Sequence, residues 1–213
     1  MNKVIIVDSE CANLNSIYKA VTAAGLTADI TDEPDKITGA DAIIFPGVGS
    51  YKHAMRVLEQ KQLVDPLMTT IKKGIPFLGI CLGMQLLCSC SEENHAQGST
   101  ERIQGLNAVK GLVTRFNNEL PVPHVGWNQV QPAVGHPLFY GLGNSSYFYF
   151  THSYYVTPDS DENILARTSY GINFTSAIIR NNLLGVQFHP EKSGPAGLRL
   201  LSNFGKIIAG KEH

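Results

Sequence analysis

The sequence predicts an α/β fold: one three-layer domain over residues 1–213, with a mixed, mainly parallel central sheet and additional short antiparallel strands. Short apolar runs alternate with helical patterns in the first half, which is typical of a parallel sheet covered on both faces. In the second half the runs are short, aromatic and separated by turns, which favours antiparallel pairing. No repeat, low-complexity tract or long linker divides the chain.

The first half contains the alternating elements. Buried strands are expected at Val4–Val7, Ala42–Phe45 and Ile75–Ile80. Helices are expected over Asn13–Ala24, from Ser50 to about Lys73 with a break before Pro66, and from Leu82 to about Cys90.

The second half contains the predicted antiparallel strands, at Gly111–Phe116, Asn128–Gln131, Tyr147–Val156, Ile164–Thr168 and Ala177–Arg180. Leu183–Phe188 is expected to return to the parallel sheet, and Ala196–Ala209 to close the chain as an amphipathic helix. Ser91–Asn107 is polar and predicted to be a loop.

Composition excludes several classes of function. The chain has 17 Lys plus Arg, 18 Asp plus Glu and a net charge of −1, so binding to nucleic acid or to an anionic membrane is not expected. Only 16% of residues are charged, which indicates a large core or a face hidden against a partner.

No apolar stretch approaches the roughly 18 residues of a membrane span, and the amino terminus lacks a signal pattern. The four cysteines form no disulfide framework, which favours the cytoplasm. No cofactor or metal is expected, because no His or Cys pair has zinc spacing; Cys88 and Cys90 are attributed to packing.

A candidate nucleophile lies where a strand meets a helix. The run Gly79-Ile80-Cys81-Leu82-Gly83 has the Gly-x-nucleophile-x-Gly form of a sharp elbow, in which only hydrogen fits at the glycine positions. The helix N-terminus would favour the Cys81 thiolate. A buried structural cysteine is the alternative interpretation.

A candidate base follows another strand. In extended chain His189 and Glu191 would project to the same face, and Pro190 between them marks the end of the strand. Parallel strands place their carboxyl ends at one edge, so Cys81 and His189 are expected to meet there. A surface histidine beside a solvated glutamate is the alternative.

A third segment, Pro46–Ser50, also follows a strand. Its glycines allow backbone N–H groups to approach a ligand, so Val48, Gly49 and Leu82 are candidate oxyanion-hole residues. Gly47 and Gly49 would also permit a peptide flip that turns a carbonyl away from the site and an N–H toward it. A purely structural turn is the alternative.

Together these segments resemble the class I, or triad-type, glutamine amidotransferases. The Cys elbow plus His-Pro-Glu is specific to that class. The runs Pro-Gly-Val-Gly-Ser at 46–50 and Pro-His-Val-Gly-Trp-Asn at 123–128 are similar to the branch that serves histidine biosynthesis.

The resemblance implies a function for each matching residue. Cys81 is the expected nucleophile, His189 the acid/base and Glu191 its orienter. The implied contacts with the substrate, L-glutamine, come from Gly49, Gln85, Glu93, Ser153 and Tyr154, with Glu93 receiving the α-ammonium and Gly49, Ser153 and Tyr154 acting through their backbone.

The resemblance also implies a partner, a (β/α)₈-barrel cyclase subunit that uses ammonia to make imidazole glycerol phosphate and an aminoimidazole carboxamide ribonucleotide. The residues that match the partner-facing edge are Asn13, Asn15, His124, Trp127 and Lys192. Local alternatives remain: a helix cap for Asn13, a core position for Trp127 and a solvated surface for Lys192. Near this edge, relatives commonly carry Asp-Tyr-Gly where this chain has Asp8-Ser9-Glu10.

Other functions remain open on the sequence. The chain could be the glutaminase subunit of another amidotransferase, of the pyridoxal phosphate or anthranilate type. Less expected are a cysteine peptidase-like hydrolase, a thiol-stress protein and a scaffold subunit with an inactive site.

Overall fold

Five parallel strands form the centre of the structure, a computed structural model that describes residues 3–93, 101–117, 119–133, 135–143 and 146–210. Their order is β2-β1-β3-β4-β13, and neighbours are parallel throughout. Their carboxyl ends therefore share one edge. The strands are β1 (Val4–Val7), β2 (Ala28–Thr31), β3 (Ala42–Gly47), β4 (Phe77–Cys81) and β13 (Leu183–Val186).

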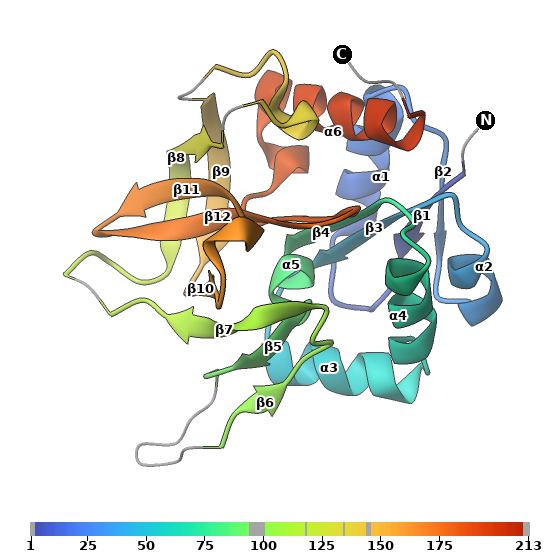
Figure 1. Cartoon of the computed structure of the whole chain (residues 1–213), viewed down its shortest axis with the longest axis horizontal. Helices are drawn as coiled ribbons and strands as arrows, with labels where there is room; N and C mark the ends of the chain where they lie inside the picture. Colours follow the sequence, from blue (N-terminus) through green and yellow to red (C-terminus); the bar gives the residue numbers. More distant parts are fainter. Residues whose placement is uncertain (1–2, 94–100, 118, 134, 144–145, 211–213) are drawn as a thin grey trace.

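Helices cover both faces of these strands (Figure 1). One apolar cluster joins the sheet to α1 (Leu14–Ala23) and α6 (Gly194–Ile208). A second cluster, on the other face, joins the sheet to α2 (Pro34–Thr38), α3 (Tyr51–Gln60), α4 (Val64–Lys72) and α5 (Leu82–Leu86). The predicted α/β class with a mixed sheet is confirmed.

The sheet continues beyond β13 mostly with antiparallel neighbours. After β13 the order is β12 (Ile172–Arg180), β10 (Tyr154–Pro158), β7 (Val109–Arg115), β5 (Cys88–Ser91) and β6 (Ile103–Gln104). A branch leaves β12 through β11 (Ile164–Tyr170) to β8 (His124–Pro132) and β9 (Ser146–His152). Short 3₁₀ turns occur at Pro137–Phe139, Asp161–Asn163 and Pro190–Lys192.

Several expected boundaries were wrong. The helix from Leu82 ends at Leu86, because Cys88–Ser91 pairs with β7 as a strand. The break expected before Pro66 is confirmed: α3 ends at Gln60 and α4 begins at Val64, so Pro66 lies in the first turn of α4, where its missing N–H needs no intrahelical partner. Tyr147–Val156 is two strands divided at Ser153, and the predicted loop contains β6.

No helix among the described residues is both long and apolar enough to cross a membrane.

Candidate active site

Cys81 occupies a strained turn between β4 and α5. Its backbone has φ 54° and ψ −111°, a conformation that L-residues rarely adopt. A Cβ added at Gly83 would lie 1.8 Å from the carbonyl oxygen of Phe45, and one at Gly79 would lie 3.0 Å from the Cα of Met84. The expectation that only hydrogen fits at both glycines is confirmed.

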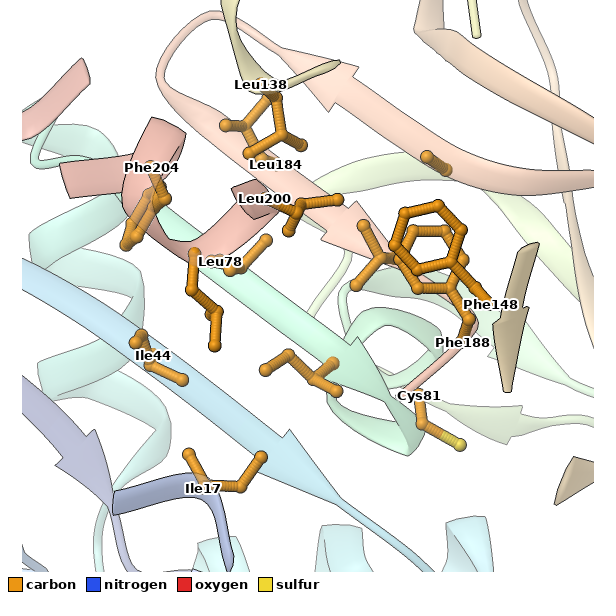
Figure 2. Packing of buried hydrophobic residues seen from close by; sticks show 14 of the residues in the cluster. Ile17, Ile44, Leu78, Cys81, Leu138, Phe148, Leu184, Phe188, Leu200 and Phe204 are labelled. Carbon is orange, nitrogen blue, oxygen red and sulfur yellow. The ribbon is translucent and has the colours of Figure 1, made fainter. Parts of the chain in front are cut away.

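The turn exposes the sulfur toward a cavity rather than into the core. In Figure 2 the Cys81 side chain lies at the end of the packed apolar residues, with its sulfur directed away from them. Cys81 lines a cavity of about 290 Å³. The helix behind it has only five residues, so helix-dipole stabilisation of a thiolate is weaker than expected.

His189 and Glu191 form a buried pair. The Nδ1 atom of His189 lies 2.8 Å from Oε1 of Glu191, and their side chains are 2% and 4% exposed. The pair does not arise from extended chain, as the sequence argument assumed: Pro190–Lys192 is a 3₁₀ turn capped by His189. The turn brings Glu191 back toward the imidazole.

Strand β9 holds this turn in place. The backbone N–H of His189 donates to the carbonyl of Tyr149 at 2.9 Å. Ser193 links the same two residues, because its hydroxyl donates to the His189 carbonyl at 2.6 Å and accepts from the Tyr149 N–H at 3.0 Å. The acid/base candidate is therefore fixed by a strand from the antiparallel half.

The electrostatics favour a charged imidazole. Burial alone lowers the pKa of His189, but its interactions with Cys81 and Glu191 outweigh burial and raise the pKa to about 10. The Nε2 atom is buried and has no hydrogen-bond partner among the described residues. Glu191 holds Nδ1, so Nε2 is the nitrogen left to serve Cys81, and a charged imidazole that favours a thiolate is typical of an activated cysteine.

The cavity beside Cys81 collects the other candidate residues. Its lining includes every residue expected to form the oxyanion hole or bind substrate: Val48, Gly49, Leu82, Gln85, Glu93, Ser153 and Tyr154. These come from segments as far apart as β3 and β10. A larger groove of about 510 Å³ runs along α3 and contains none of them.

Val48 does not act as an oxyanion donor in this conformation. Its N–H donates to the carbonyl of Cys11 at 2.5 Å. The prediction for Val48 is therefore wrong in this conformation, because its N–H is already hydrogen-bonded to the carbonyl of Cys11 and cannot reach a ligand. Gly49, with φ +99°, and Leu82, at the start of α5, remain as candidates.

Glu93 has a structural contact as well as a place in the cavity. Its carboxylate accepts the N–H of Tyr51 at the start of α3. Burial raises the pKa of Glu93, while hydrogen bonds from α3 oppose that rise. The carboxylate can still face a ligand cation, since it has a second oxygen.

The backbone carbonyls of Tyr154 and Ser153 are both hydrogen-bonded within the protein. The Tyr154 carbonyl accepts from the side chains of Gln85 and His152, at 3.0 and 2.8 Å. The Ser153 carbonyl accepts the N–H of Phe116 at 3.0 Å. Their carbonyls are therefore occupied, which leaves N–H groups and side chains for a ligand.

Four of the five expected partner residues are accessible. Asn13 is exposed, although its side chain accepts the N–H of Ser16 and caps α1, and Asn15 is exposed nearby. Trp127 is 55% exposed, so the core interpretation is wrong. The Lys192 ammonium lies 5.8 Å from the centre of the Tyr149 ring.

His124 is the exception, because it is buried. It is only 3% exposed and stacks between Phe150 and Tyr170, with ring centres 4.8 and 3.9 Å away. On β8 its side chain alternates with that of Trp127 and so points to the opposite face. A direct contact between His124 and a partner is excluded in this structure.

The sequence argument missed Gln187 and His152. Gln187 is fully buried, and its Nε2 lies 3.6 Å from the Cys81 sulfur. His152 lines the cavity. The available signal for Gln187 was a polar residue inside an otherwise apolar run, Leu183–Phe188. No group of three His, Cys, Asp or Glu residues placed to hold a metal occurs in the described part of the chain.

Comparison with known proteins agrees with this geometry. The family described as "Glutamine amidotransferase class-I" matches residues 5–208. The chain is 43% identical over 208 residues to imidazole glycerol phosphate synthase subunit HisH of Moorella thermoacetica, covering 98% of this chain and 96% of that protein. It is 45% identical over 205 residues to the HisH of Photorhabdus laumondii, covering 95% and 98%.

Solved structures show the same fold. The structure of PurLQS from Thermotoga maritima matches with a TM-score of 0.76 at 16% identity, covering 98% of this chain and 100% of that chain. A structure described as a glutamine amidotransferase matches with a TM-score of 0.73 at 19% identity, covering 97% and 99%. The chain belongs to the class I glutamine amidotransferases and, within them, to the family of imidazole glycerol phosphate synthase subunit HisH.

Proposed function

We propose that residues 1–213 form one glutaminase unit that hydrolyses L-glutamine to L-glutamate and ammonia for imidazole glycerol phosphate synthesis in histidine biosynthesis. The observation that carries this proposal is the placement of Cys81 at a cavity, with the buried His189–Glu191 pair acting on it. Membership of the HisH family supports the choice of pathway.

The geometry supports a two-stage hydrolysis. The Cys81 thiolate attacks the side-chain carbonyl of glutamine, and backbone N–H groups of Gly49 and Leu82 stabilise the oxyanion. The His189 imidazolium protonates the departing ammonia, and a γ-glutamyl thioester remains. Water activated by neutral His189 then releases glutamate and regenerates the thiol.

The Val48 peptide limits the oxyanion hole. Its N–H is bonded to the Cys11 carbonyl, so a third donor becomes available only if this peptide turns. Gly47 and Gly49 on either side lower the steric barrier to such a turn. We infer that occupation of the partner's active site drives the turn and so couples hydrolysis to ammonia demand.

Ammonia must reach its consumer without entering bulk water, where it becomes protonated. We infer that a (β/α)₈-barrel cyclase subunit docks on the outer face of β8 and β9. That face exposes Val125, Trp127 and Tyr147, which are 56%, 55% and 53% exposed, with Lys192 beside it. Aromatic side chains of this kind are enriched at protein interfaces.

Four free cysteines, three of them buried, support action in the reducing cytoplasm. The synthase as a whole would act as a lyase on the cyclase substrate, while this chain contributes the glutaminase step.

The proposal is tested by Cys81→Ala in the reconstituted complex. Glutamine-dependent synthesis should be lost, whereas synthesis from added ammonium salt should persist, because only the glutaminase site is removed. Cys90→Ala is the matched control, since Cys90 lies on β5 outside the cavity, and it should retain both activities. Loss of both activities in the Cys81 variant would show that Cys81 has a structural role.

The choice of partner has its own test. Complementation of a strain lacking the histidine-pathway glutaminase should succeed. Success only with a pyridoxal phosphate or anthranilate system would assign the chain to that system instead.

A further inference from the structure

A buried amide contacts the sulfur of the candidate nucleophile. The Nε2 of Gln187 donates to Sγ of Cys81 at 3.6 Å, and Gln187 is fully buried. Its Oε1 accepts from Nε2 of Gln85 at 3.0 Å. A wholly buried amide is costly unless its polar atoms are bonded, so these two contacts explain how a glutamine persists among apolar residues.

The same contacts fix the orientation of Gln85. Its Nε2 also donates to the Tyr154 carbonyl at 3.0 Å, so both amide hydrogens are used. The Oε1 of Gln85 accepts no hydrogen bond from the described residues, and Gln85 lines the cavity. Gln85 therefore offers a ligand an acceptor.

The chain of hydrogen bonds continues away from the cavity. The Tyr154 carbonyl also accepts from Nδ1 of His152 at 2.8 Å, which leaves Nε2 of His152 as an acceptor for Nδ1 of His124 at 2.9 Å. The Nε2 of His124 accepts in turn from Asn128 at 3.3 Å. Neutral histidines have one donor and one acceptor nitrogen each, so this sequence of bonds has one consistent direction.

We propose that Gln187 is a positioning residue: it orients the Cys81 sulfur for attack and, through Gln85, ties that sulfur to the buried His152–His124–Asn128 chain. This inference rests on the proposed glutaminase function. It assigns Gln187 a role that packing alone would not need, because an apolar residue of similar size would fill the same space without bonding Cys81 or Gln85.

Two variants separate the donor of Gln187 from its acceptor. Gln187→Glu keeps an oxygen for Gln85 but replaces the donor beside the sulfur with a charge that opposes a thiolate. Gln187→Leu removes both. Ser176→Ala is the matched control: Ser176 is buried on β12, its carbonyl accepts the Gln187 N–H, and its hydroxyl has no partner among the described residues.

The first measurement is the rate of Cys81 alkylation by iodoacetamide in the isolated chain, followed peptide by peptide with Cys90 as the internal reference. We expect this rate to fall by about tenfold or more in both Gln187 variants, the size of effect expected for one hydrogen bond to a charged group. It should remain within about twofold of wild type in Ser176→Ala.

The second measurement is glutamine hydrolysis by each variant in complex with the cyclase. Gln187→Glu should lower kcat and leave KM nearly unchanged, because a glutamate oxygen at position 187 can still accept the hydrogen bond from the Gln85 amide and keep Gln85 in place. Gln187→Leu should lower kcat and raise KM. Folded Gln187→Leu with wild-type alkylation and wild-type kcat would overturn the inference and reduce Gln187 to a packing residue.

A third measurement uses the wild-type chain, so it does not depend on whether a variant folds. In the isotope-labelled wild-type chain, the side-chain amide resonances of Gln187 should shift when Cys81 is alkylated, and unchanged resonances would overturn the inference. A wild-type chain that hydrolyses no glutamine in complex with the ligand-bound cyclase, and that alkylates Cys81 no faster than Cys90, would instead remove the proposed function, and this inference with it.

Discussion

The two halves of the sheet contribute to the site in different ways. The parallel half, β1 to β4, places Cys81 through backbone sterics: apolar strands, a strained turn and two glycines with no room for a side chain. The antiparallel half, around β8 and β9, works through polar bonds: Tyr149 holds the His189 turn, and His152 holds the Tyr154 carbonyl. The elbow is one short turn of the chain that packs against the neighbouring strand β3, whereas these bonds join segments far apart in sequence.

The difference between the halves is also visible in their two faces. Both faces of the parallel strands are buried by helices, so β1 and β4 are buried along their whole length. The β8–β9 pair buries His124 and Phe150 on its inner face and exposes Val125 and Trp127 on its outer face. The parallel half is therefore covered on both faces, whereas the antiparallel half leaves one face of β8 and β9 available to a partner.

The largest effect is expected at Gly83, which tests whether the elbow of the parallel half is held by sterics. We expect Gly83→Ala to cost about 3 kcal/mol or more in the free energy of unfolding, and to abolish glutaminase activity, since its Cβ would overlap the Phe45 carbonyl. Urea denaturation measures this cost. Gly143→Ala, where a Cβ would meet nothing within 4 Å, should change stability little. A stable, active Gly83→Ala would show that the elbow is not sterically locked.

The outer face of β8 is the next test. Trp127→Ala should weaken binding to the cyclase by roughly tenfold or more, as expected for an aromatic interface residue, and leave the melting temperature nearly unchanged. Calorimetric titration measures the affinity. Ile30→Ala is the control, because Ile30 is 40% exposed on β2, at the opposite end of the sheet. Equal effects of the two variants would place the interface elsewhere.

The two buried histidines of the antiparallel half, His124 and His152, should make the stability of the fold depend on pH. Burial lowers the pKa of His124 to about 4 and that of His152 to about 3. Below pH 6.5 the unfolded chain therefore binds protons that the folded chain does not, and stability falls as pH falls. Each histidine contributes at most about 1.4 kcal/mol per pH unit.

This slope has a direct check. His152→Gln should flatten the decline in unfolding free energy between pH 6 and pH 4.5, whereas Tyr170→Phe should lower stability equally at every pH, because it removes a hydrogen bond without removing a histidine. The raised pKa of His189 works in the opposite sense, since its stabilisation is present below pH 6.5 and lost as pH rises toward 10. If His152→Gln left the decline in unfolding free energy at acid pH unchanged, His152 would have to be protonated in the folded chain as well.

The smallest expected effect lies at Glu10. Its φ is +58°, a conformation that favours glycine. Glu10→Gly should stabilise the chain by about 0.5 to 1 kcal/mol, less whatever the exposed ion pair with Lys61 contributes. Thermal unfolding measures the change, with Glu10→Ala as the comparison that removes the ion pair but keeps a Cβ. Greater stability of the alanine variant would contradict the backbone argument.

The sequence by itself determined the frame and the reacting groups. Apolar runs placed four of the five parallel strands, and the glycines around Cys81 placed the elbow, because both patterns are visible in neighbouring residues. Strand β2 was not predicted, because only its first and last residues are buried. The sequence also correctly brought together His189 and Glu191, although the turn that joins them is 3₁₀ rather than extended.

Only the tertiary structure decided which polar atoms meet. The Val48 N–H donates to the Cys11 carbonyl, and the buried His124 is hydrogen-bonded to His152. The Gln187 side chain donates to the sulfur of Cys81, which is 106 positions away in sequence. No local pattern encodes such partners, because a hydrogen bond depends on the position of both atoms in space, and those positions exist only after the two halves of the sheet have packed.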